Sequence, residues 1–367
     1  MTKRLVKGFD RSFPLASMSN SSKPPTLQDV ARDAGVSCNT ASVVLNGSRS
    51  NTRVSEATRQ RVLDAAESLR YVPNAMARGL AQKRTKTIGV LFGVAAGSTD
   101  YVTNPYMAGI LQGVLEAAGD AGHCVTIFTQ RWVNAKVSAP AFRDGRTDGV
   151  LVIAPPANAD ILPGLAALGI ALAAVACEAV DLAIPSADVD NWVGVEAVVR
   201  HLMGLGHRKI GLITGECDMS STAIRTSAFC SAMKLAGIEH DGSTALACKY
   251  SGAGAEEAFL ELWQRPTRPT AIFACNDAIA AGVARAARDI GVRIPDELSL
   301  VGFDDVATAA MVTPPLTTIR QPLQKIGIAA AEMLLGRIAG ESFPANARLL
   351  PPELIVREST GPAFRIR

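Results

Sequence analysis

Residues 26–46 read TLQDVARDAGVSCNTASVVLN, and this stretch decides the architecture at the start of the chain. Thr26, followed three positions later by Asp29, has the pattern of a capping box, which predicts the beginning of a helix. The helix ends at Gly35, because glycine readily adopts positive φ, and Ser37 caps a second helix two residues later. Two short helices joined this tightly must cross steeply, so the sequence predicts a helix-turn-helix.

A third helix, predicted over residues 55–70, completes a three-helix core. The outward side of the second helix then carries Cys38, Asn39, Ser42, Val43 and Asn46, whose side chains are available to a major groove. The positions expected in the core are Leu27, Val30, Ala31 and Ala34, then Ala41, Val44 and Leu45, then Val62, Ala66 and Leu69. Arg53, Arg59 and Arg61 are expected to be available to phosphates.

Charge is divided unevenly along the 367 residues, whose formal net charge is +3. The first 86 residues contain 15 Lys and Arg against 6 Asp and Glu, a net charge of +9, and the remainder carries −6. A small basic module beside a larger acidic body favours a polyanion as the partner of the module. The alternative is a basic segment that serves only solubility.

Residues 73–87 predict a hinge. Asn74 is a plausible helix cap, but the segment is short, and Gly79 costs about 1 kcal/mol relative to alanine inside a helix. Such a helix is mostly unfolded alone in water. We therefore predict a hinge that becomes helical only on DNA.

Together these residues carry a family resemblance. Residues 26–37, Thr40-Ala41-Ser42 with Asn46, residues 71–74 and residues 77–80 resemble the headpiece of the LacI/GalR family, and the resemblance extends to about Arg357. It implies a homodimer that reads a pseudo-palindromic double-stranded DNA operator, with paired hinge helices in the minor groove and Leu80 wedged between base pairs. An ordinary interface leucine is the alternative at that position. The DNA-binding residues implied are Thr26, Ser37, Cys38, Asn39, Thr40, Ser42, Val43, Asn46, Asn74, Ala77, Arg78 and Leu80.

The recognition helix departs from the family at Val43, where relatives commonly carry arginine. An arginine prefers guanine, whereas valine contacts only a thymine methyl group. We expect Cys38, Asn39 and Val43 to face base edges, and Ser42 and Asn46 to contact phosphates. The loop between Asn46 and Val54 also looks longer than in relatives.

From Thr87 onward, apolar runs alternate with amphipathic helical stretches, which is typical of parallel α/β sheets. The number of strands indicates two doubly wound lobes, the second beginning near Asn191, with the chain crossing back within residues 315–322. A ligand is expected between the lobes, at the C-terminal ends of the strands. The predicted strands are 88–92, 125–128, 150–153, 171–175, 210–213, 271–273 and 298–301, and the predicted helices are 106–121, 193–205, 222–235, 278–290 and 325–340.

The resemblance extends to this body, which is expected to be similar to periplasmic binding proteins. Carried over residue by residue, it implies an effector site of Arg225, Asn276 and Asp304, with Tyr106, Tyr250 and Arg131 alongside. A guanidinium, an amide and a carboxylate suit the hydroxyls of a sugar or related polyol. The alternatives are that Asn276 caps a helix, that Asp304 and Asp305 cap a helix or turn, and that Arg225 pairs with a surface carboxylate. Ala176 stands where relatives often carry a ligand-facing aspartate.

Other classes of protein are disfavoured. The sequence has no nucleotide-binding fingerprint and no catalytic cluster, and its four histidines lack metal-ligand spacing. We therefore expect no enzyme activity, no cofactor and no metal. Seven scattered cysteines favour a reducing compartment. A secreted sugar-binding protein would share the two-lobed fold but would need an export signal.

The predicted organisation is a disordered extension at 1–24, the headpiece at 25–72, the hinge and linker at 73–87, and an effector-binding and dimerisation domain at 88–367. Residues 1–17 could instead reflect an upstream start codon. No apolar stretch is long enough for a signal peptide or a membrane span, so a cytoplasmic location is expected. The tail after Arg357 lacks a leucine heptad, which predicts a dimer without a tetramerising coiled coil.

Overall fold

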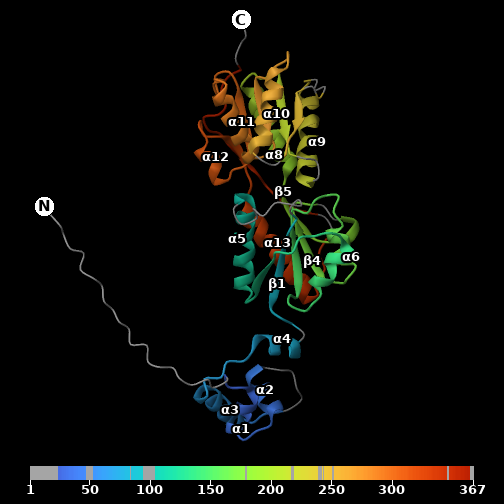
Figure 1. Cartoon of the computed structure of the whole chain (residues 1–367), viewed down its shortest axis with the longest axis vertical. Coiled ribbons are helices and arrows are strands. Elements are labelled where there is room, and N and C mark those ends of the chain that lie inside the picture. Colours follow the sequence, from blue (N-terminus) through green and yellow to red (C-terminus); the bar gives the residue numbers. More distant parts are fainter. Residues whose placement is uncertain are drawn as a thin grey trace, which may run out of the picture. The chain divides into compact units, whose positions relative to one another are not determined.

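The computed structural model describes residues 24–46, 53–82, 84–93, 104–177, 180–215, 219–238, 242, 244–249, 252–344 and 347–363. The chain divides into two compact units, Met1–Lys83 and Arg84–Arg367. Figure 1 labels their elements. The extension predicted to be disordered, apart from Pro24, lies outside the described residues, as does the loop at 47–52.

The first unit contains the predicted helix-turn-helix. Helices α1 (Leu27–Asp33), α2 (Cys38–Asn46) and α3 (Glu56–Ser68) bury one shared core, in which Val30, Ala41 and Val62 have no solvent exposure. Thr26 and Asp29 form the reciprocal capping box, and Gly35 ends α1 with φ +61°. All ten predicted core positions contribute to this cluster, so the predicted helix pattern is confirmed.

Helix α4 (Ala75–Gln82) belongs to the same unit. Asn74 caps it by accepting a hydrogen bond from the backbone N–H of Ala77 at 3.1 Å. At its other end, Gln82 Nε2 donates to the backbone carbonyl of Asn46, at the end of α2, at 2.9 Å. The predicted helix after Asn74 is confirmed, whereas its dependence on DNA stays a prediction.

The first lobe of the second unit is a six-stranded parallel sheet. Long helices α5 (Pro105–Asp120) and α13 (Leu323–Ala339) lie against each other on one face. The other face is covered by α6 (Ala135–Ser138), η1 (Ala139–Phe142) and α7 (Ile161–Ala166). The strand order is β11 (Ala347–Leu350), β5 (Ser186–Val189), β4 (Ala171–Val175), β3 (Gly149–Ile153), β1 (Thr87–Phe92), β2 (Cys124–Phe128).

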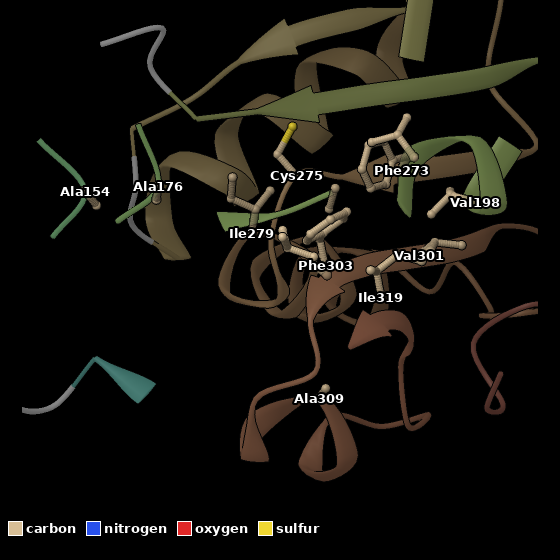
Figure 2. Close-up of a cluster of buried hydrophobic side chains, with 14 of the residues drawn as sticks. Ala154, Ala176, Val198, Phe273, Cys275, Ile279, Val301, Phe303, Ala309 and Ile319 are labelled. Carbon is tan, nitrogen blue, oxygen red and sulfur yellow. The ribbon is translucent and has the colours of Figure 1, made fainter. Parts of the chain in front are cut away.

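The second lobe repeats this architecture with one antiparallel edge strand, β12. Helix α8 (Asn191–Gly204) packs on α9 (Ser220–Leu235), and α10 (Gly252–Gln264) packs on α11 (Asp277–Asp289), with the short α12 (Ala307–Met311) beside α11. Figure 2 shows Phe273, Phe303 and Ile319 within its core. The strand order is β12 (Glu353–Ile355), β10 (Thr317–Arg320), β9 (Ser299–Asp304), β8 (Ala271–Ala274), β6 (Ile210–Thr214), β7 (Ala245–Ala247).

The chain passes between the lobes three times, after Val189, after Arg320 and after Leu350. All seven predicted strands are present, and the first two crossings lie where they were predicted. The third crossing was missed because β11 and β12 are short edge strands with no continuous apolar run. Strands β5, β7 and β10 and helices α6, α7, α10 and α12 were also missed.

Two glycines allow α5 and α13 to approach closely. A Cβ added at Gly113 would overlap the backbone carbonyl oxygen of Gln324, and one added at Gly327 would overlap that of Ile110. Backbone atoms cannot rotate away as a side chain does, so any larger residue forces the helices apart. Gly119, in the same helix α5, is exposed and has open space around its Cβ position.

Replacing Gly113 with alanine should lower the free energy of unfolding by about 2 kcal/mol, because the extra methyl overpacks the helix contact. The matched substitution Gly119→Ala should be neutral or stabilise by up to about 1 kcal/mol through helix propensity. Urea unfolding of both variants measures the difference. Equal stability of the two variants would show that the helices do not require close approach.

Candidate functional site

Two groups of polar residues stand out, one in each unit. In the first unit, Cys38 and Asn39 are exposed at the start of α2, and Val43 is partly exposed one turn later. Ser42 and Asn46 bond to each other, with Asn46 Nδ2 donating to Ser42 Oγ at 3.0 Å. The outward side of α2 therefore presents a thiol, an amide and an apolar side chain, with a hydroxyl and amide pair behind them.

Several residues assigned to DNA binding also hold the helices themselves. The hydroxyl and the backbone N–H of Thr26 donate to Asp29 Oδ2 at 2.7 and 2.9 Å. These two hydrogen bonds lower the pKa of the Asp29 carboxyl. Ser37 Oγ accepts from the N–H of Thr40 at 3.1 Å and lies 2.8 Å from its hydroxyl. These contacts cap the first turns of α1 and α2.

The hinge helix exposes Ala77 and Arg78, whereas Gly79 is buried. Leu80 lies in α4, but its side chain is not among those described. Arg53, Arg59 and Arg61 are exposed, in line with the phosphate contacts expected of them.

The second unit contains a buried polar cluster around Arg225 of α9, which is 6% exposed. Arg225 Nε donates to Asn191 Oδ1 at 2.8 Å, and Nη1 donates to the carbonyl of Cys275 at 2.6 Å. The guanidinium carbon lies 3.7 Å from the centre of the Phe303 ring. Buried charges need such partners, because water no longer stabilises them.

Asp304, the last residue of β9, faces this guanidinium, with 3.7 Å between its Oδ1 and Arg225 Nη1. Gln321 Nε2 donates to the same oxygen at 2.6 Å. Burial raises the pKa of Asp304 to about 6, although Arg225 and Gln321 oppose that rise. Its φ of 123° lies in a region that residues other than glycine rarely occupy, so surrounding contacts must hold it there.

The first lobe contributes Tyr106 and Asp188 to this cluster. Burial, and then the negative charges of Asp188 and Asp304, raise the pKa of the Tyr106 phenol well above its usual value, while Arg225 opposes them. Asp188 Oδ2 accepts from Asn191 Nδ2 at 3.2 Å. Charged and polar groups of both lobes therefore lie close enough to influence one another electrostatically, and an isolated bridge between Pro156 and Met219 also joins the lobes.

A further carboxyl, Asp277, is completely buried next to this cluster. It accepts hydrogen bonds from the Thr318 hydroxyl at 2.6 Å and from the N–H of Val306 at 3.0 Å. A Cβ at Gly302 would overlap its oxygen, so glycine is required there. Burial, reinforced by the nearby Asp304 charge, raises the pKa of Asp277 to about 8.

Only some of the predicted effector residues lie together in the structure. Arg225, Asp304 and Tyr106 come together, and Arg225 pairs with a buried carboxylate instead of a surface one. Asn276 caps α11 by accepting from the N–H of Ile279 at 2.8 Å, although it directly follows Cys275, which contacts Arg225. Arg131 is exposed, with no contact to the cluster among the described residues, and Tyr250 lies outside them.

Asp304 and Asp305 do not cap a helix. Asp305 instead forms ion pairs with Arg320 at 2.7 Å and Arg357 at 2.6 Å, and α12 begins after Val306 without a side-chain cap. The helix-capping part of that alternative is therefore wrong, whereas the turn-capping part stays a prediction. Ala176, like Asp304, has positive φ, and its buried methyl group offers no polar contact.

Four polar residues of the cluster, Asp188, Asn191, Asp277 and Gln321, were not predicted as site residues. Asp188 and Gln321 lie beside the first two crossings, whose positions were predicted, but neither side chain was assigned to the site. A usable signal existed for Asp188, because it is a carboxylate in the middle of the short run Ser186–Val189 that becomes a buried strand.

Within the ranges that the structure describes, no three His, Cys, Asp or Glu side chains are grouped so that they could hold a metal ion. No helix there is both long enough and apolar enough to cross a membrane.

The raised pKa of Asp277 makes the stability of the second unit depend on pH. The folded protein retains this proton up to about pH 8, whereas the unfolded chain releases it near pH 4. The free energy of unfolding should therefore fall as pH rises from about 4 to 8, by at most about 1.4 kcal/mol per pH unit for one proton. Asp304 adds a similar fall that ends near pH 6.

Asp277→Asn should flatten the decline between pH 6 and 8, because its amide can accept from Val306, donate to Thr318 and never ionise. Asp289→Asn, an exposed change at the other end of α11, is the control and should keep the wild-type slope. Urea unfolding at pH 5 to 9 measures all three proteins. An unchanged slope in Asp277→Asn would contradict proton uptake at this carboxyl.

Comparison with known proteins identifies both units. The family described as "Bacterial regulatory proteins, lacI family" matches residues 26–74, and the "Periplasmic binding protein-like domain" matches residues 199–360. The HTH-type transcriptional repressor PurR of Photobacterium profundum is 33% identical, and the match covers 91% of this chain and 98% of that protein. The ribose operon repressor of Escherichia coli is 31% identical, covering 91% of this chain and 99% of that repressor.

Solved structures agree with these relatives. The complex of the transcriptional regulator CelR with cellobiose is 30% identical, with a TM-score of 0.69, and covers 91% of this chain and 99% of its own. The lac repressor dimer bound to operator is 26% identical, with a TM-score of 0.79, over 92% of this chain and all of the repressor chain. The chain therefore belongs to the lacI family of bacterial regulatory proteins and is a DNA-binding transcription regulator with a periplasmic-binding-protein-like second domain.

Proposed function

We propose that this regulator binds a pseudo-palindromic operator as a homodimer, and that a sugar bound between its lobes controls its affinity for that operator. The observation that carries the effector proposal is the buried pair of Arg225 and Asp304, surrounded by groups from both lobes.

The chemistry of the cluster suits hydroxyl groups. One guanidinium faces one carboxylate, so an uncharged ligand keeps the charges matched, and each hydroxyl can accept from Arg225 while donating to Asp304. The Gln321 Oε1 atom is buried and has no hydrogen-bond partner among the described residues, which offers a further acceptor. The names of two similar proteins, the ribose operon repressor and the complex of CelR with cellobiose, also point to sugars.

A dimer follows from the two-fold symmetry of a pseudo-palindromic operator, because each half-site binds one headpiece. The lac repressor structure similar to this chain is a dimer bound to operator. Residues 358–363 pack on the second lobe, where Ser359 is completely buried and donates to the carbonyl of Leu300 at 2.6 Å. A segment held in this way is not available for a coiled coil.

The linker offers a route from the effector to the hinge. The backbone N–H groups of Thr85 and Lys86 donate to Asp148 at 2.6 and 2.8 Å, and Arg84 Nη2 donates to the carbonyl of Ile338 at 3.2 Å. Any movement of the first lobe is therefore passed to the residues directly after α4. A change in the spacing of the two hinge helices, with Leu80 as the wedge, then alters operator binding, with a typical coupling of 1 to 3 kcal/mol.

Arg225→Ala should abolish the response to sugar and leave operator affinity without sugar close to wild type. A thermal-shift panel of D-ribose, D-glucose, cellobiose, sorbitol and adenosine finds the ligand, because occupancy at 100 times its dissociation constant adds about 2.7 kcal/mol of stability. Arg131→Ala is the matched control and should respond as wild type does. A full sugar response in Arg225→Ala, or no stabilisation of wild type by any sugar, would contradict the proposal.

Val43→Arg should shift the selected operator toward guanine at one symmetric position, because arginine pairs with guanine O6 and N7. Selection from a randomised duplex pool, followed by sequencing, compares the variant with wild type. Gln60→Arg adds the same charge on the exposed side of α3 and should strengthen binding without changing the motif. An unchanged motif in Val43→Arg would remove this residue from the base-reading set.

A further inference from the structure

Asn191 occupies an unusual position at the first crossing between the lobes. It is the first residue of α8 and is 4% exposed. One residue, Asp190, separates it from β5 of the first lobe. Its Nδ2 donates to Asp188 Oδ2 and to the Val189 carbonyl, both at 3.2 Å. Its Oδ1 accepts from Arg225 Nε at 2.8 Å. One amide therefore bonds to both lobes.

Among the described residues, the other hydrogen-bond, ring and ion-pair partners of Arg225 come from the second lobe. Cys275 follows β8, and Phe303 and Asp304 end β9. The planar guanidinium is fixed by two hydrogen bonds and a ring face, so removing one of them frees its rotation. Asn191 is the one described partner of Arg225 that is also bonded to a first-lobe strand.

We propose that Asn191 is a positioning residue through which the first lobe sets the orientation of the Arg225 guanidinium. A shift of β5 displaces Asp188 and Val189, and their hydrogen bonds move the Asn191 amide with them. Because Arg225 Nε bonds to that amide, its free N–H groups turn relative to Asp304. Sugar bound to Arg225 pulls on β5 through the same bonds, since coupling between two sites is reciprocal.

The effect on sugar binding rests on the function proposed above, but the effect on Arg225 does not. The first measurement therefore uses the full-length protein without sugar or DNA. In arginine-labelled protein, the exchange of the Arg225 Nε–H with water reports directly on its hydrogen bond to Asn191.

Exchange should be at least tenfold faster in Asn191→Ala than in wild type. Asn191→Asp keeps an acceptor oxygen at that place and should restore slow exchange. Asn134→Ala is the matched control, because Asn134 also stands at a helix start but caps α6, in the first lobe, through Val137. Wild-type exchange in Asn191→Ala, equally fast exchange in Asn134→Ala, or no restoration in Asn191→Asp would each overturn the proposal.

The second measurement is calorimetric titration with the sugar from the panel that binds wild type. Asn191→Ala should bind it about tenfold more weakly, and Asn191→Asp should recover part of that loss, while Asn134→Ala binds as wild type does. Unchanged affinity in Asn191→Ala would overturn the positioning role. If no sugar of the panel binds wild type, the proposed function fails, and the exchange measurement alone decides the role of Asn191.

Discussion

A guanidinium group removed from water must be matched by acceptors on every side, and this requirement organises the centre of the second unit. Arg225 meets it with the amide of Asn191, the carbonyl of Cys275, the face of Phe303 and the carboxylate of Asp304. These partners come from a crossing and from two strand ends. The parallel sheets must therefore be in register before the charge is compensated, which links the site to the whole of the two-lobed fold.

Two adjacent aspartates at the end of β9 bind different partners. Both have positive φ, 123° for Asp304 and 54° for Asp305, so their carboxylates point in different directions. Asp304 faces Arg225, whereas Asp305 binds Arg320, the last residue before the second crossing, and Arg320 also binds Glu353 at the start of β12. The polar cluster around Arg225 and the second and third crossings are thus held by neighbouring residues. Backbone strain at this point is maintained by contacts on both sides.

The first unit is specified by local interactions. Its three helices are short, locally capped and closed by a small apolar core, so each part is specified by residues close in sequence. In helix α4, Asn74 caps the first turn and Gln82 donates to the Asn46 carbonyl at the end of α2. This helix is the last element of the first unit, so it leads directly into the second unit.

The sequence by itself determined the helix-turn-helix, seven strands, the two-lobed architecture and three members of the polar cluster, Tyr106, Arg225 and Asp304. Caps and apolar periodicity act over a few residues, so they can be read locally, and the family resemblance supplied the three site residues. Only the tertiary structure decided that Asp188, Asn191, Asp277 and Gln321 join that cluster and that Arg131 lies apart from it. The reason is physical: a buried charge selects its partners by distance across crossings and neighbouring strands, and sequence spacing carries no record of that distance.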